Sequence, residues 1–156
     1  MTAQVFDPGE GTHLRARGSE MVFKALAATT HGSFSFMERD LPPGGRRPPR
    51  HVHVGADEAF YVLRGEVTFS LDEETTTRGA GSFVLVPGGV MHSFGNEGTE
   101  PAGVLIVHAP AMDGYFRELH ELWSDPDSAP TREQEMELMA RHGMRPETAE
   151  PPEPQA

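Results

Sequence analysis

The sequence predicts an all-β domain, either a closed barrel or a double-sheet jelly roll, followed by two helices. About eight short apolar or alternating runs occur at regular spacing along the first two thirds of the chain, as in such folds. The 17 glycines and 14 prolines punctuate the turns between these runs. Beyond residue 110, apolar residues recur at helical spacing instead. A barrel of this kind has room for a packed interior and one small ligand.

The 156 residues suffice for one domain, which we divide into four segments. We expect an N-terminal arm with the first strand or strands in residues 1–32 and the barrel in residues 33–110. The two helices are expected in residues 111–145. The remainder, 146–156, is acidic and rich in proline, and we expect a disordered tail because such a segment cannot bury enough apolar surface to fold.

Composition limits the classes of partner. The net charge of −11 makes nucleic acid an unsuitable partner, because it would repel the phosphate backbone. The absence of cysteine excludes disulfides, thiolate metal sites and a cysteine nucleophile. No run of eighteen apolar residues occurs, and the start of the chain lacks a basic segment followed by an apolar one. We therefore expect a cytoplasmic protein that interacts with neither nucleic acid nor membranes.

The first strands lie on either side of a short turn. Residues 22–26 are apolar enough for a strand, and Thr30–Gly32 predicts a turn. Residues 33–41 then alternate, with Phe36 on one face and Met37 on the other. Alternation alone does not say which of these faces is the inner one.

The next strands are expected at residues 58–63 and 66–71, joined by a turn at Gly65. A polar hairpin loop follows at residues 72–74. Their inward faces are expected to carry Glu58, Phe60, Val62, Val67, Phe69 and Leu71. The run 82–86 is apolar throughout, which favours a strand buried on both sides. Val104 to Ala109 complete the set.

Two helices are predicted after the barrel. Asp113 is placed to cap the first helix. Its apolar face consists of Tyr115, Phe116, Leu119, Leu122 and Trp123, which we expect to plug or flank the barrel. Thr131–Gln134 is a capping-box pattern that opens the second helix, and Gly143 and Pro146 end it.

Three histidines and one glutamate form a candidate metal site. His51 and His53 are two residues apart, so on a strand both point to one face. Glu58 must be re-aimed by the turn that follows His53, and His92 must return from another strand after the Pro87–Gly89 turn. Four nitrogen and oxygen ligands would hold one divalent transition metal per chain. Iron, nickel, cobalt, manganese, copper and zinc all remain open.

These residues also carry a resemblance to a known family. The pattern G-x5-H-x-H-x4-E-x6-G runs from Gly45 to Gly65, and G-x5-P-x-G-x2-H-x3-N runs from Gly81 to Asn96. Together they resemble the two motifs of the cupin superfamily at all ten specified positions. The resemblance covers roughly residues 34–109. It implies the cupin double-stranded β-helix, which is a jelly-roll barrel, with His51, His53, Glu58 and His92 as metal ligands.

A second, less specific resemblance concerns the C-terminal part. Pro110, Tyr115-Phe116 and Met139–Gly143 resemble the single-domain bacterial cupins related to quercetinase, the flavonol dioxygenase. This resemblance implies a metal-dependent dioxygenase that acts on a small phenolic or enolic compound, with Glu58 as a catalytic base as well as a ligand. Two alternatives stay open. One is a metal-dependent isomerase, epimerase or polyketide cyclase, and the other is a small-molecule-binding cupin without catalysis.

The surroundings of the site yield further expectations. The candidate substrate pocket consists of Met37, Phe60, Val62, Phe69, Phe94 and His108. The arginines at positions 46, 47 and 50 lie close to His51, and we interpret them as a solvated basic loop in preference to a gate for an anionic substrate. We also expect a homodimer, because the N-terminal arm with Val22–Leu26 could add to the sheet of a neighbour.

Overall fold

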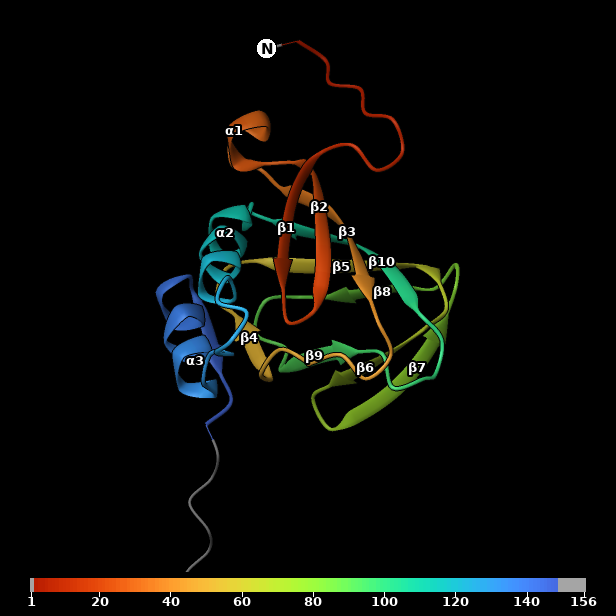
Figure 1. Cartoon of the computed structure of the whole chain (residues 1–156), viewed down its shortest axis with the longest axis vertical. Helices are drawn as coiled ribbons and strands as arrows, with labels where there is room; N and C mark the ends of the chain where they lie inside the picture. The colour runs from red at the N-terminus through yellow and green to blue at the C-terminus, as the bar shows by residue number, and fades with distance from the viewer. Residues whose placement is uncertain (1, 149–156) are drawn as a thin grey trace, which may run out of the picture.

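A computed structural model describes residues 2–148 of the chain, and residues 1 and 149–156 are left out of the description. Two antiparallel sheets face each other and form the jelly roll, with α2 and α3 along one side of it (Figure 1). The expected all-β fold with two C-terminal helices is therefore confirmed. None of the described helices has the length and apolarity that crossing a bilayer requires.

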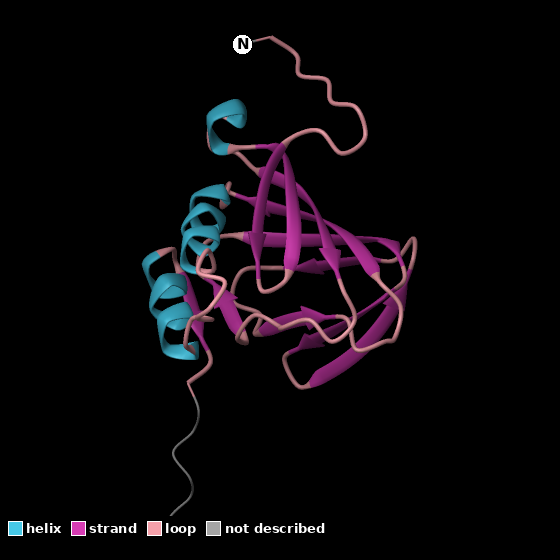
Figure 2. Cartoon of the chain, viewed as in Figure 1, coloured by secondary structure: helices cyan, strands magenta, loops and turns pink. Residues whose placement is uncertain are grey.

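The six-stranded sheet has the order β1-β2-β3-β10-β5-β8, and the five-stranded sheet has the order β11-β4-β9-β6-β7 (Figure 2). The first sheet contains β1 (Thr12–Ala16), β2 (Ser19–Ala25), β3 (Ser35–Leu41), β10 (Ala102–Ala109), β5 (Asp57–Arg64) and β8 (Phe83–Val86). The second contains β11 (Met144–Pro146), β4 (His51–His53), β9 (His92–Gly95), β6 (Glu66–Leu71) and β7 (Glu74–Gly79). The helices are α1 (Ala27–Thr30), α2 (Asp113–Leu122) and α3 (Arg132–Arg141).

The core lies between the two sheets. Phe60 and Val62 of β5 and Val67 and Phe69 of β6 point inward and are buried, as their alternation predicts. The rings of Phe60 and Phe69 meet edge to face, with centroids 5.2 Å apart. The two faces of β3 can also be told apart, because Met37 is fully buried whereas Phe36 is only half-buried. The Met37 face is therefore the inner one.

Three strands were not expected from the sequence: β1, β7 and β11. The strand β7 has the polar sequence Glu-Thr-Thr-Thr-Arg-Gly, and it pairs with β6 alone at the edge of its sheet. Edge strands are held by backbone hydrogen bonds and need no buried face, so their side chains carry little apolar signal. The strand β1 also lies at the edge of its sheet, although its Leu14 and Ala16 side chains are buried.

The expectation for residues 82–86 was wrong. The strand β8 lies at the edge of the six-stranded sheet, and its outer side chains Phe83 and Leu85 are 63% and 55% exposed. Among residues 2–148 no layer covers the outer side chains of β8, and only Val84 and Val86 turn toward the interior. An unbroken apolar run suggests a strand covered on both faces, but the described residues cover only one face of β8.

The homodimer remains a prediction, but its expected contact changes. Val22–Leu26 is not free to join a neighbour's sheet, because β2 already pairs with β1 and β3. We expect contact at the outer face of β5 and β8 instead, where Tyr61 and Phe83 lie side by side. Light scattering at micromolar protein should give twice the 17.0 kDa chain mass, and Phe83→Glu should shift the mass toward the monomer. A wild-type mass of 17.0 kDa would contradict the prediction.

The predicted N-terminal cap is present in α3 but not in α2. The capping box of α3 is present, because Thr131 Oγ1 accepts from the backbone of Gln134 and the Gln134 side chain accepts from the backbone of Thr131. Asp113, by contrast, does not cap α2, in which it is the first residue. Its carboxylate instead accepts a hydrogen bond from the backbone of Ala27, at the start of α1.

The boundary at residue 146 also needs correction. Pro146 belongs to β11, and the backbone of Glu147 donates to the carbonyl of Arg50 at 2.7 Å. The rest of the predicted disordered tail, residues 149–156, lies outside the described part of the chain. By pairing with β4, β11 places Met144 opposite His53, so the C-terminal segment directly supports the strand that carries two candidate ligands.

Candidate metal centre

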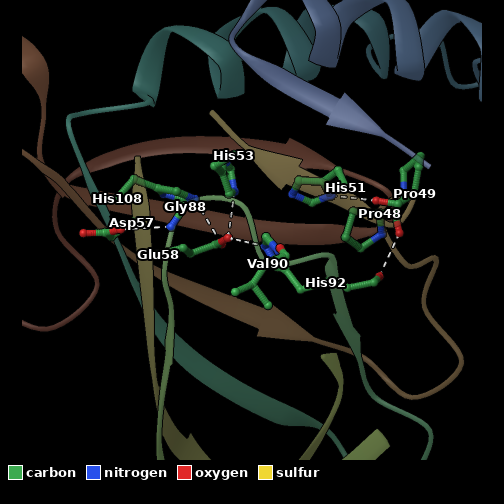
Figure 3. Close-up of polar contacts among 11 residues, drawn as sticks. Pro48, Pro49, His51, His53, Asp57, Glu58, Gly88, Val90, His92 and His108 are labelled. Carbon is green, nitrogen blue, oxygen red and sulfur yellow. Dashed lines mark hydrogen bonds and ion pairs between the residues drawn. The ribbon is translucent and has the colours of Figure 1, made fainter. Parts of the chain in front are cut away.

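The structure brings the four predicted ligands together from three strands (Figure 3). His51 and His53 come from β4, and His92 comes from the neighbouring strand β9, where it pairs directly with His51. Glu58 comes from β5 in the opposite sheet, so the turn after His53 carries the chain from one sheet to the other. All four side chains are buried, and one ligand atom from each lies within 4.8 Å of the others.

Backbone carbonyls orient two of the imidazoles. His51 Nδ1 lies 2.7 Å from the carbonyl of Pro49, and His92 Nδ1 lies 2.9 Å from the carbonyl of Val90. A carbonyl can only accept, so each Nδ1 donates its hydrogen. The Nε2 atoms of His51 and His92 are therefore left with lone pairs directed into the site, which is how metal-binding histidines are usually held.

The contacts of Glu58 test whether a cation fits here. Its Oε2 lies 2.8 Å from His92 Nε2 and 2.9 Å from His53 Nε2. Because His92 carries its hydrogen on Nδ1, its Nε2 lone pair faces a carboxylate oxygen across a hydrogen-bonding distance. Two acceptors that close repel each other unless a proton or a metal ion lies with them. The donor set of three imidazoles and one carboxylate suits a divalent first-row metal.

The electrostatics of the site keep His51, His53 and Glu58 in their metal-binding forms, whereas for His92 burial is outweighed by the contact with Glu58, which raises the pKa. Burial, together with the nearby His92, lowers the pKa of His51 to about 3. Burial likewise lowers the pKa of His53, so both imidazoles are neutral at pH 7. Burial alone would raise the pKa of Glu58, but the charge and hydrogen bond of His108 and the hydrogen bond of His53 hold it well below its usual range. Glu58 is therefore a carboxylate.

His108 supports Glu58 from the other side. The two residues are direct neighbours across β10 and β5, and His108 Nε2 lies 3.0 Å from Glu58 Oε1. His108 Nδ1 is buried and has no hydrogen-bond partner among the described residues. The sequence placed His108 in the pocket but not its contact with Glu58, because the pairing of strands 50 residues apart cannot be seen in local spacing.

A cavity of about 20 Å³ adjoins the ligands. Of the predicted pocket residues, Phe94 and His108 line it. Met37, Phe60, Val62 and Phe69 do not line it and instead belong to the hydrophobic core, because they pack against one another with at most 1% exposure. Sequence reasoning missed much of the wall, which also includes Arg17, Arg39, Pro48, Tyr115, Phe116 and Met144.

The basic loop before His51 has contacts of its own. The Arg46 guanidinium lies 5.3 Å from the centre of the Trp123 ring, Arg47 pairs with Glu97 at 2.6 Å, and Arg50 contacts Glu147 at 3.3 Å. These arginines line an open cleft of about 480 Å³. Pro48 lines both this outer cleft and the inner cavity, so the loop forms the wall between them.

The other motif positions are structural. The Asn96 side chain donates to the carbonyls of Leu41 and Glu100 and so ties two loops together. Gly65 has a φ of +65°, and a Cβ there would lie 2.5 Å from the carbonyl oxygen of Pro101. Only glycine fits that turn, which is why the pattern contains residues that never contact the ligands.

Comparison with known proteins identifies the class. Residues 37–108 match the family model described as a cupin domain, and the chain carries a cupin domain over that range. A solved structure of a predicted oxalate decarboxylase from Thermotoga maritima superposes with a TM-score of 0.62 at 28% identity, covering 69% of this chain and 99% of that one. The cupin resemblance is therefore confirmed.

Two curated relatives differ in what they are named for. The polyketide synthase CurC of Streptomyces cyaneus is 28% identical over 110 residues, which are 70% of this chain and 71% of that protein. The quercetin 2,3-dioxygenase of Bacillus subtilis is 30% identical over 118 residues, which are 74% of this chain but 34% of that protein. The chain thus spans about a third of the dioxygenase, and the cupin class hosts more than one chemistry.

Proposed function

We propose that this chain is a metal-dependent dioxygenase that acts on a small phenolic or enolic compound. The observation that carries the proposal is the position of Glu58, a buried carboxylate between His53 and His92 with His108 behind it. His51, His53, Glu58 and His92 would hold the metal. When bound, a divalent transition metal supplies a Lewis acid and positions at which a substrate oxygen and dioxygen are activated. The similarity to quercetin 2,3-dioxygenase supports the oxygen-dependent reaction.

The residues of the chain would perform three tasks. Glu58 would accept the proton of the substrate hydroxyl, and the 3.0 Å contact from His108 Nε2 to Glu58 Oε1 holds the carboxylate in place. The carbonyls of Pro49 and Val90 keep His51 and His92 in the orientation that directs Nε2 into the site. Phe94 and Phe116 would provide apolar walls for the cavity.

Oxygen consumption tests the proposal. Protein loaded in turn with iron, nickel, cobalt or manganese should consume oxygen with at least one small phenol or enol, and metal-free protein should not. An oxygen electrode measures this directly. The absence of uptake with every metal and every such compound would overturn the oxygen-dependent reaction.

A second candidate is a metal-dependent isomerase, epimerase or polyketide-cyclase activity that needs a Lewis acid and no oxygen. It is favoured by the relative CurC, of which the chain spans 71% against 34% of the dioxygenase. The same ligands and the same proton acceptor would serve either reaction. Substrate conversion under strictly anaerobic conditions would establish this second activity in place of the first.

A further inference from the structure

Arg39 is a buried cation beside the metal centre that the proposed reaction does not yet use. It lies on the inner face of β3, is 3% exposed, and lines the cavity together with His51, His53 and Glu58. Among residues 2–148 its single hydrogen bond runs from Nε to Ser19 Oγ at 2.9 Å, and it takes part in no ion pair. Four of its five N–H donors are therefore uncommitted.

The carboxylate that could have neutralised Arg39 is already engaged elsewhere. Glu135 Oε1 accepts from Arg17 Nε at 2.8 Å and from the Trp123 indole at 2.8 Å. Arg17 also donates to the hydroxyl of Tyr115. Two guanidinium groups, Arg17 and Arg39, and one carboxylate, Glu58, line the cavity, and Glu58 already contacts His53, His92 and His108.

The charge of Arg39 persists at neutral pH. Burial, then the charge of Arg17, lowers the pKa of Arg39 to about 10, so the guanidinium stays protonated. A buried charge is unfavourable unless an opposite charge or a full set of hydrogen bonds compensates it. Contact with the Phe94 ring, whose centre lies 5.5 Å from the guanidinium carbon, stabilises the cation but does not neutralise it. A water molecule could occupy the cavity but would not neutralise the charge.

We propose that Arg39 binds the carboxylate of the substrate, and that the substrate is a small carboxylate whose enol, phenol or hydroxyl oxygen faces Glu58 and the three histidine ligands. This proposal rests on the proposed function, because it concerns the same site and narrows its substrate class. The planar fork of a guanidinium matches the two oxygens of a carboxylate, which makes arginine the residue best suited to this role. Arg39 would then be a specificity-determining residue.

The cavity beside the ligands adjoins a second space. The first has about 20 Å³, and the second, of about 10 Å³, lies on the side of the loop from Pro42 to Pro48. Arg17, Arg39, Pro48 and Phe94 line both. A carboxylate bound at Arg39 would therefore lie beside the space that His51, His53 and Glu58 line.

The test compares two probes that differ in charge but hardly in shape: glycolate and its neutral amide, glycolamide. Both are titrated by calorimetry into nickel-loaded wild type, into Arg39→Gln and into the control Arg64→Gln, which removes an exposed arginine. Wild type and the control should prefer glycolate, and Arg39→Gln should lose at least about tenfold of that preference. Because the metal itself also attracts carboxylates, the quantity that decides is the change in the ratio of the two affinities.

A merely structural role of Arg39 would weaken both probes equally and leave the ratio unchanged, and that result would overturn the proposal. If Arg39→Gln does not fold, as judged by its circular dichroism and melting curve, Arg39→Lys replaces it. The lysine keeps the charge but not the fork, so the preference should fall by less, and an undiminished preference would contradict the bidentate contact. Failure of the proposed reaction is separate, because it appears as absent oxygen uptake while the Arg39-dependent preference persists.

Discussion

Replacing His92 with alanine is expected to remove most of the bound metal. The Nε2 atom of His92 lies 2.8 Å from Glu58, and its ring is fixed by the carbonyl of Val90, so the variant loses one oriented donor of four. Losing a hydrogen bond that only supports a ligand costs about 10–100-fold in metal affinity, and losing the ligand itself should cost more. Elemental analysis after dialysis measures the effect.

The same loss is expected for His51→Ala and His53→Ala. His13→Ala is the matched control, because His13 is half-exposed on β1 and contacts Glu20 rather than any candidate ligand. The control should keep the metal content of the wild type. Full metal content in all three ligand variants would remove the site from consideration.

Replacing Glu58 with glutamine is expected to lower turnover by about a hundredfold or more, while metal content falls only modestly. Glutamine keeps the size of the side chain and a carbonyl oxygen, but it does not accept a proton at neutral pH. The rate should be measured as oxygen uptake at matched metal loading, with Glu97→Gln as the control, since Glu97 is exposed and pairs with Arg47.

The effect of Glu58→Gln should depend on the ionisation of the substrate. A compound that is already deprotonated at the assay pH does not need the base, so it should recover part of the lost rate, and a neutral compound should not. Oxygen uptake equal to that of the wild type would mean that Glu58 is a ligand and nothing more.

Two of the candidate ligands, His51 and His53, could be placed together from local geometry, and the complete set of four came from the resemblance to the cupin motifs. The two-residue spacing of His51 and His53 fixes their common face on a strand, and the turns before Glu58 and His92 are marked by glycine and proline. The inner face of β5, with Phe60 and Val62, was predicted for the same reason. The common face of His51 and His53 and the inner face of β5 need only the direction of neighbouring side chains along one strand.

The rest of the site depends on which strands pair. His108 reaches Glu58 through the register between β10 and β5, and no local spacing reports that register. Arg39 shares its strand face with Met37, and alternation does not say which face of β3 points inward. The helix α2 supplies Tyr115 to the cavity wall, a position set by how the helix packs on the sheets. The positions of His108, Arg39 and Tyr115 therefore depend on long-range packing, which the periodicity of the sequence does not reveal.

Four of the six residues predicted for the substrate pocket lie in the core for a related reason. Met37, Phe60, Val62 and Phe69 are apolar and point inward, as a pocket wall would. A small barrel, however, fills most of its interior with such side chains, and only the part near the ligands stays open. The inward direction of a side chain thus distinguishes interior residues from surface residues. It does not distinguish residues of the packed core from residues that line the cavity.

The position of the metal tests the central claim most directly. Crystals of nickel-loaded protein should give one anomalous diffraction peak per chain at the nickel edge, bound by the Nε2 atoms of His51, His53 and His92 and by the carboxylate of Glu58. Bond lengths near 2.0–2.2 Å, as nitrogen and oxygen ligands give with first-row metals, are expected for all four. A peak on other residues, or none in protein that elemental analysis shows to be loaded, would contradict the claim that these four residues form the metal centre.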